Sequence, residues 1–232
     1  MSSVIVGDLR LEVRASNRRT TLQLTVDRGG ELIVFAPTDC DASALHRFVR
    51  AKRLWIYKKL AEQEALAHPV ATKEYVSGEG FPYLGRSYRL LLVEEQQPVP
   101  VKLESGRLKM RRSAAINGRA HMVDWYTVRA QPWLSERAER IAARVGVTPS
   151  GIHVQDLGYR WGSCSRGERL NFHWKTILLP PRIAEYVVAH ELVHIRTPHH
   201  TLEFWEKLER AMPDYSARKA WLAGHGAVAT AI

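Results

Sequence analysis

Apolar and polar residues alternate along the first 37 residues, and this period of two predicts β-strands. The alternating apolar positions are Leu9, Leu11 and Val13, followed by Leu22, Leu24 and Val26. The sequence DRGG at residues 27–30 is typical of a turn, and an apolar run at residues 32–35 follows it. We therefore expect strands joined by a hairpin at the start of the chain.

Beyond Asp41 the apolar period lengthens to three and four residues, which predicts an amphipathic helix over about residues 42–65. The apolar positions are Leu45, Phe48, Val49, Trp55, Ile56 and Leu60. Asp41 itself is a typical N-cap. Glycines and prolines then separate short strand-like segments, and Gly106 marks a second hairpin turn. Residues 1–112 are therefore expected to form a β-rich N-terminal subdomain with one long helix.

The pattern becomes mainly helical after residue 113. A helix is expected over about residues 117–145, with Pro132 marking either a kink or a break. A strand-like stretch at residues 152–157 leads into a hairpin closed by residues 165–167.

A second helix begins at Pro181, since proline is tolerated in a first helical turn, and Pro198 stops it after about residue 196. Two short helices are expected at about residues 201–212 and 214–224. The sequence thus predicts an α+β fold in which residues 113–232 form a second, largely helical subdomain.

The formal net charge is +10, and it is spread over both parts, with +6 in residues 1–112 and +4 in residues 113–232. Such a bias favours acidic partners and admits a weak association with nucleic acid. The two cysteines, Cys40 and Cys164, form no CxxC pair, which argues against a cysteine zinc cluster or a disulfide framework.

The first residues lack the apolar core of a signal peptide, and no stretch approaches the roughly 18 apolar residues that a membrane span needs. We therefore expect a soluble cytoplasmic protein that does not bind a membrane.

Candidate chemistry lies in VAHELVHIRTPHH, residues 188–200, which contains an HExxH motif. Residues four apart project from the same face of a helix, so His190 and His194 would lie side by side, as two ligands of one zinc ion must. The surrounding helix is apolar almost all round and is expected to be buried. Two histidines and Glu191 would be costly there unless something such as a metal ion pairs with them.

A hydrolytic zinc site needs three protein ligands and an open fourth position. Since Pro198 ends the helix, the chain can turn back, and His200 is our choice for the third ligand. His199, Glu203 and Glu206 are the alternatives. Cys164 could also approach the metal.

Glu191, offset from the ligands, would be the general base that takes a proton from the water activated by zinc and passes it to the leaving group. The reaction class that follows is metal-assisted hydrolysis of a carbonyl or phosphoryl group.

Four segments together resemble the YgjP-like metallopeptidase family, a relative of SprT-like and WLM peptidases in the zincin group. They are YRWGSC, LNFHWKTILLP, EYVVAHELVHIRTPHH and EFWEKLERAMPDY. The resemblance implies a zincin-like catalytic half in which His190, His194 and His200 bind zinc and Glu191 is the base. It also implies that the strand around residues 170–175 holds an extended peptide by edge pairing.

Trp161 and Trp174 either line a groove or pack in the core, and Tyr215 either donates a hydrogen bond to a developing oxyanion or packs at a helix start. Three functions compete. The first is a zinc metallopeptidase acting on a peptide or protein. The others are a metal-dependent UTP pyrophosphatase, which the resemblance also implies, and a nucleic-acid-binding module with structural zinc.

Overall fold

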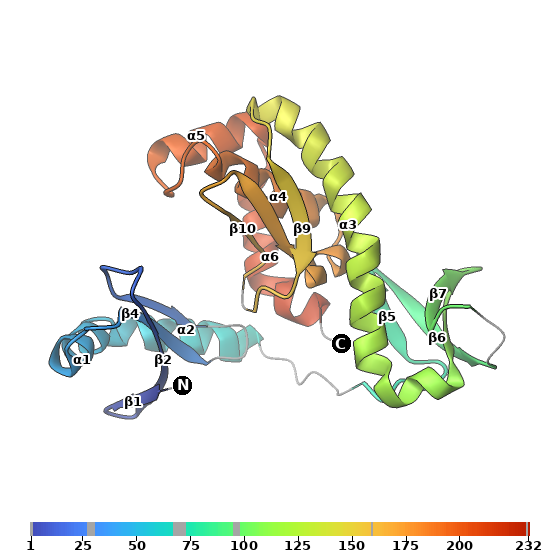
Figure 1. Cartoon of the computed structure of the whole chain (residues 1–232), viewed down its shortest axis with the longest axis horizontal. Helices are drawn as coiled ribbons and strands as arrows, with labels where there is room; N and C mark the ends of the chain where they lie inside the picture. The colour runs from blue at the N-terminus through green and yellow to red at the C-terminus, as the bar shows by residue number, and fades with distance from the viewer. Residues whose placement is uncertain (1, 27–30, 67–72, 95–97, 159, 231) are drawn as a thin grey trace. The chain divides into compact units, whose positions relative to one another are not determined.

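The computed structural model describes residues 2–26, 31–66, 73–94, 98–158, 160–230 and 232. In it the chain has the expected α+β fold, with a β-rich N-terminal half and a mainly helical C-terminal half. It forms two units, Met1–Pro69 and Val70–Ile232 (Figure 1). The division therefore lies well before the boundary expected at residue 112.

The first unit is built on a four-stranded sheet of order β1-β2-β4-β3. Its strands are β1 (Ser2–Val6), β2 (Leu9–Ser16), β3 (Gln23–Val26) and β4 (Leu32–Pro37). Strands β3 and β4 pair antiparallel, as the expected hairpin requires, while the turn predicted at residues 27–30 lies outside the described residues. Strand β1 was not anticipated, and β2 pairs parallel with β4.

Two helices, α1 (Ala42–Ala51) and α2 (Arg53–Leu66), replace the single helix expected over residues 42–65. Lys52 interrupts the pair without any proline or glycine to mark the break. Val49 of α1 and Ile56 of α2 are both fully buried in the same apolar cluster as Leu11 and Val34 of the sheet. The apolar pattern was therefore interpreted correctly, and only the break was missed.

The second unit begins with another four-stranded sheet, of order β5-β6-β8-β7. Its strands are β5 (Gly80–Tyr83), β6 (Arg86–Val93), β7 (Val101–Glu104) and β8 (Arg107–Arg111). The turn at Gly106, which has a φ of +72°, joins β7 and β8 as expected. This sheet packs on helix α3 (Gly118–Val145), and the Tyr126 hydroxyl donates to the Pro82 carbonyl over 2.7 Å. Because sheet and helix share one core, no domain boundary falls at residue 112.

Helix α3 runs without interruption through Pro132. The proline therefore does not break the segment into two helices, and α3 is one continuous helix of 28 residues. Figure 1 shows it passing alongside both sheets of the second unit. Gln131 connects it to the next sheet: its amide nitrogen donates to the Ile152 carbonyl over 2.9 Å, and its amide oxygen accepts from the Val154 N–H over 3.0 Å. These two bonds occupy the outer edge of strand β9 (Gly151–Gln155).

The sheet that includes β9 has the order β10-β11-β9, where β10 is Gly162–Cys164 and β11 is Arg169–His173. Strands β10 and β11 form the expected antiparallel hairpin, and β11 pairs parallel with β9. Strand β10 is thus the edge that Gln131 does not cover.

The remaining helices are α4 (Pro181–His194), α5 (Leu202–Ala211) and α6 (Tyr215–Ala229), close to the expected ranges except that α6 is longer. Short 3-10 turns, η1 (Arg112–Asn117) and η2 (Trp174–Leu178), connect the earlier elements. Helix α4 is buried as predicted, with Ile183, Val188 and Leu192 fully inside the core.

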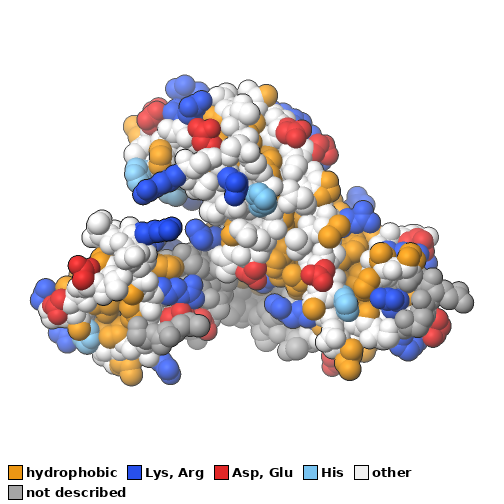
Figure 2. Space-filling view, viewed as in Figure 1, with side chains coloured by type: hydrophobic (Ala, Val, Ile, Leu, Met, Phe, Trp, Pro, Cys, Tyr) orange, Lys and Arg blue, Asp and Glu red, His pale blue; other side chains and the backbone are white. Residues whose placement is uncertain are grey.

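Among the described helices, none combines the length and apolar character needed to cross a bilayer. On the face seen in Figure 2, lysine and arginine side chains occur on both units and are interspersed with acidic and hydrophobic ones. This agrees with a positive charge that is spread along the sequence.

Candidate metal centre

The HExxH segment forms the last turns of the buried helix α4, which presents His190 and His194 on one face. Their rings lie 4.9 Å apart, centroid to centroid, as expected for residues one turn apart. After α4 ends, the chain turns back through Pro198, and His200 reaches the same place. One ring nitrogen from each of the three histidines lies within 4.8 Å of the others.

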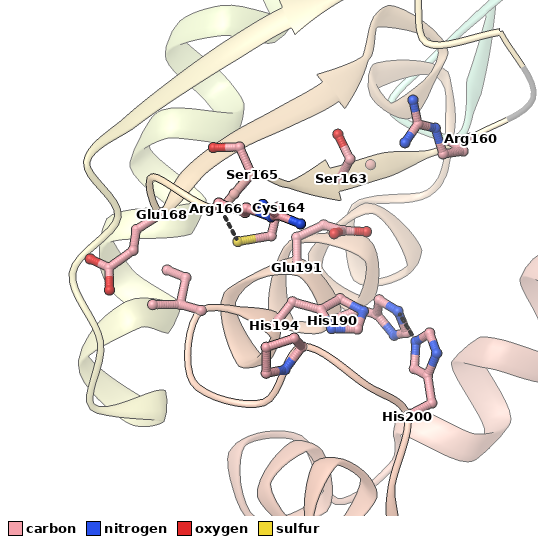
Figure 3. Close-up of a pocket in the computed structure, with 13 residues that line it drawn as sticks. Arg160, Ser163, Cys164, Ser165, Arg166, Glu168, His190, Glu191, His194 and His200 are labelled. Carbon is pink, nitrogen blue, oxygen red and sulfur yellow. Dashed lines mark hydrogen bonds between the residues drawn. The ribbon is translucent and has the colours of Figure 1, made fainter. Parts of the chain in front are cut away.

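The spacing of these nitrogens suits a metal ion. His190 Nε2 and His200 Nε2 are 2.9 Å apart. Two nitrogens bound at 2.0–2.1 Å to one tetrahedral zinc lie about 3.3 Å apart, so a small outward shift would admit the ion. Figure 3 shows the three rings converging below Glu191. A donor set of three neutral imidazoles therefore fits zinc.

His194 is held in a defined tautomer by the loop that follows the helix. Its Nδ1 lies 3.1 Å from the Thr197 carbonyl, which can only accept, so Nδ1–H donates and Nε2 keeps its lone pair for a metal. Thr197 is itself buried, and its hydroxyl accepts a hydrogen bond from Lys207 Nζ over 3.0 Å. The turn after α4 therefore orients a candidate ligand as well as redirecting the chain.

The environment keeps all three imidazoles neutral near pH 7. Burial lowers the pKa of His190 to about 3, with smaller contributions from His194, His200 and Lys219. Burial is also the main reason that the pKa values of His194 and His200 are lowered. Neutral rings are the form that binds a metal.

Glu191 is 7% exposed and points from α4 towards strand β10, away from the ring cluster (Figure 3). Burial raises its pKa to about 8, and the positive charge of Arg160 opposes this rise. A carboxyl group with its pKa near the working pH is suited to accept and return a proton.

Strand β10 approaches Glu191 so closely that only glycine fits at position 162. A Cβ there would stand 2.6 Å from Glu191 Cγ, a distance that packed atoms do not adopt. The glycine of the WGSC segment therefore sets the separation between the strand and the candidate base.

A cleft of about 550 Å³ opens over the histidines and Glu191. Its opposite wall is formed by residues 162–166 together with Arg160 and Glu168. Arg160 and Arg166 were not expected at the site. They lie at either end of a strand that precedes the motif helix, and this position in the sequence could have indicated that they line the cleft.

The alternative ligands lie outside the histidine group. His199 is exposed, Glu206 is exposed, and Glu203 forms an ion pair with Lys207 at 2.7 Å. Cys164 lines the cleft, but it is not part of the histidine group; burial and the nearby Glu191 raise the pKa of its thiol to about 11.

Aromatic residues support the third histidine. Trp205 stacks on His200, with centroids 5.5 Å apart and planes at 21°, and Tyr215 also stacks on Trp205, at 5.7 Å. Lys219 Nζ lies 4.0 Å from the Trp205 centroid. Tyr215 therefore packs as part of this stack, while Trp174 is buried in the core.

The expected edge strand was wrong, because β11, which covers most of residues 170–175, lies in the middle of its sheet. The edge is β10. Ser165 N–H donates to the Arg169 carbonyl over 2.9 Å, and bonded residues alternate in an antiparallel pair. The N–H and C=O groups of Gly162 and Cys164 consequently point away from β11, on the side where a further strand would pair.

The model of the family described as YgjP-like, metallopeptidase domain, matches residues 20–225. Part of the chain is similar to the crystal structure of the metallopeptidase zymogen of Pyrococcus abyssi abylysin, at 17% identity and a TM-score of 0.35. That likeness covers 38% of this chain and 89% of the other. A search of curated proteins finds no significant match.

The family match extends over most of the chain and includes the complete histidine cluster, which defines the class as a metal-dependent peptidase. The chain belongs to the YgjP-like family.

Proposed function

We propose that the protein is a zinc-dependent peptidase in which His190, His194 and His200 hold the metal and Glu191 is the general base. The observation that carries the proposal is the convergence of three neutral ring nitrogens within 4.8 Å, next to a buried carboxyl group. A zinc ion bound there would lower the pKa of a water molecule and polarise the carbonyl to be cleaved.

Glu191 would accept the proton that the attacking water loses and deliver it to the leaving nitrogen of the peptide. Glu191 is 7% exposed, and its close contact with Gly162 restricts its movement. Arg160 opposes the effect of burial and so keeps the ionised form of Glu191 accessible near neutral pH.

Strand β10 would hold the substrate by adding it as a further strand. The main-chain groups of Gly162 and Cys164 that point away from β11 can pair with an extended peptide. A peptide in that position would pass over Glu191 and the histidines, because the same residues line one cleft.

The decisive experiment combines metal content with cleavage by Glu191→Gln. We expect about one zinc per chain in both proteins, and loss of peptide cleavage by about 100- to 10,000-fold in the variant, in line with removal of a general base. Cleavage at the wild-type rate by the zinc-loaded variant would exclude Glu191 as the base. Absence of cleavage of any peptide by zinc-loaded wild type would exclude the function.

A second candidate is a metal-dependent nucleoside triphosphate pyrophosphatase, which the presence of Arg160 and Arg166 in the cleft favours. It predicts pyrophosphate release from UTP that chelation abolishes. A structural zinc, by contrast, needs a fourth protein ligand. Among the described residues, the group that could hold a metal contains three histidines and no fourth ligand.

A further inference from the structure

A second hollow, of about 210 Å³, lies beside the main cleft and shares its catalytic wall. We call it the side pocket. It has Arg160, Gly162, His190 and Glu191 in common with the cleft, so whatever enters it lies next to the candidate base.

The lining residues that the side pocket does not share with the cleft are mostly apolar. They are Trp161, Tyr186, Val187 and Leu222, whereas the charged Arg160 and Glu191 lie on the shared side. Val187 is 3% exposed and Tyr186 is 6% exposed, so α4 supplies a wall that cannot easily move. Apolar pockets bind apolar groups because both surfaces leave water.

Helix α6 contributes Leu222 to the lining, and a glycine lets this helix approach Trp161 closely. A Cβ at Gly226 would stand 2.9 Å from Trp161 Cζ2 and 3.0 Å from Leu222 Cδ1. The absence of a side chain at position 226 therefore allows Trp161 and Leu222 to lie where they line the pocket.

The size of the side pocket suits one large apolar side chain. A cavity of about 150 Å³ lined by apolar residues in another protein takes up benzene, so about 210 Å³ is ample for a leucine or phenylalanine side chain. A single alanine methyl group would leave most of this volume unfilled.

The strand geometry directs a substrate side chain to this place. Side chains of directly opposed residues on paired strands point to the same face of the sheet. The Cα–Cβ direction of Gly162 is towards Glu191, as the 2.6 Å contact shows. A substrate residue opposite Gly162 would therefore direct its side chain to the Glu191 face, where the side pocket opens.

We propose that the side pocket is the specificity site of the peptidase and binds a leucine- or phenylalanine-sized side chain of the residue next to the scissile bond. This inference rests on the proposed function. It adds the class of substrate: peptides with a large apolar residue at that position.

The test begins with digestion of a mixed peptide library by the zinc-loaded full-length chain, with cleavage sites identified by mass spectrometry. Two peptides that differ only in leucine or alanine at the selected position are then compared by kcat/KM. We expect wild type to prefer leucine by at least about 10-fold, the range that apolar pockets achieve.

Leu222→Trp fills the side pocket. It should reduce the ratio of kcat/KM for the leucine peptide to kcat/KM for the alanine peptide by about 10-fold, mainly by raising KM for the leucine peptide. Val228→Trp is the matched control, since Val228 is on the same helix, is 41% exposed and lies outside the pocket. It should keep the wild-type ratio. Zinc content and thermal unfolding are measured for both variants.

Leu222→Ala provides a second route if the tryptophan variant does not fold. It enlarges the side pocket and should shift the preference from leucine towards phenylalanine or tryptophan. Wild-type preference for small or charged residues would overturn the inference and leave the peptidase intact, as would a ratio unchanged in both Leu222 variants. If no peptide is cleaved by zinc-loaded wild type, the proposed function fails and the inference fails with it.

Discussion

Gly162 of strand β10 packs directly against Glu191 of helix α4, so that a Cβ on the glycine would lie 2.6 Å from the glutamate Cγ. The buried carboxyl group and the strand proposed to hold substrate are therefore placed by direct contact. A shift of either element would move the candidate base relative to the bound peptide.

Gly162→Ala should accordingly destabilise the chain by about 1–3 kcal/mol, as overpacking of a core does, and reduce peptide cleavage. Gly167→Ala in the same hairpin is the control, because a Cβ there would meet its nearest neighbour at 4.0 Å. Denaturant unfolding gives the stabilities. Equal midpoints for the two variants would contradict the contact.

His200→Ala should weaken zinc binding by more than the roughly 10- to 100-fold typical of losing a residue that only supports a ligand. His199→Ala, a neighbouring exposed residue outside the ligand group, should bind zinc as wild type does. Competition with a chromophoric chelator measures both affinities. A larger loss in the His199 variant would reassign the third ligand.

Trp205 stacks on His200, which lies between α4 and α5 rather than in either helix. Trp205→Ala should therefore lower zinc affinity by about 10-fold, and Trp205→Phe should restore most of it by keeping an aromatic face. Trp221 makes a similar stack on His225, with centroids 5.0 Å apart. Trp221→Ala is the control and should leave zinc affinity unchanged.

The stability of the zinc-free chain should fall as pH rises from about 6.5 to 8 because of Glu191. Its pKa is about 8 when folded, against an ordinary value of 4.5, so the folded state binds more protons in that range. The slope contributed by one group is at most about 1.4 kcal/mol per pH unit.

Glu191→Gln should remove this decline, which urea unfolding at a series of pH values would reveal. The histidines act in the opposite direction. Their pKa values are lowered on folding, so their contribution is complete above about pH 6.5 and is lost on acidification. A slope that persists in the variant between pH 6.5 and 8 would show that another group titrates there.

The local sequence pattern was sufficient to predict the helix that carries the HExxH motif and the helices next to it. The period of apolar residues around His190 and His194 predicted a buried helix, and Pro198 predicted where it ends; the structure has both. The local pattern did not distinguish His200 from His199, since both residues follow the same proline, and the family resemblance gave a further reason to prefer His200.

Long-range pairing could not be read from the sequence. Residues 170–175 look like a strand, but their alternation does not reveal that β11 lies between two others. The boundary expected at residue 112 failed for a similar reason. The bond from Tyr126 to the Pro82 carbonyl joins parts of the chain that composition assigned to different subdomains.

The two hydrogen bonds between Gln131 and strand β9 also bear on the tendency of the protein to aggregate. Exposed strand edges invite other chains to pair with them and begin aggregates. By occupying one border of this small sheet with a side-chain amide, the chain directs strand addition to the opposite border. Gln131 thereby leaves β10 as the border at which we propose that a peptide substrate adds.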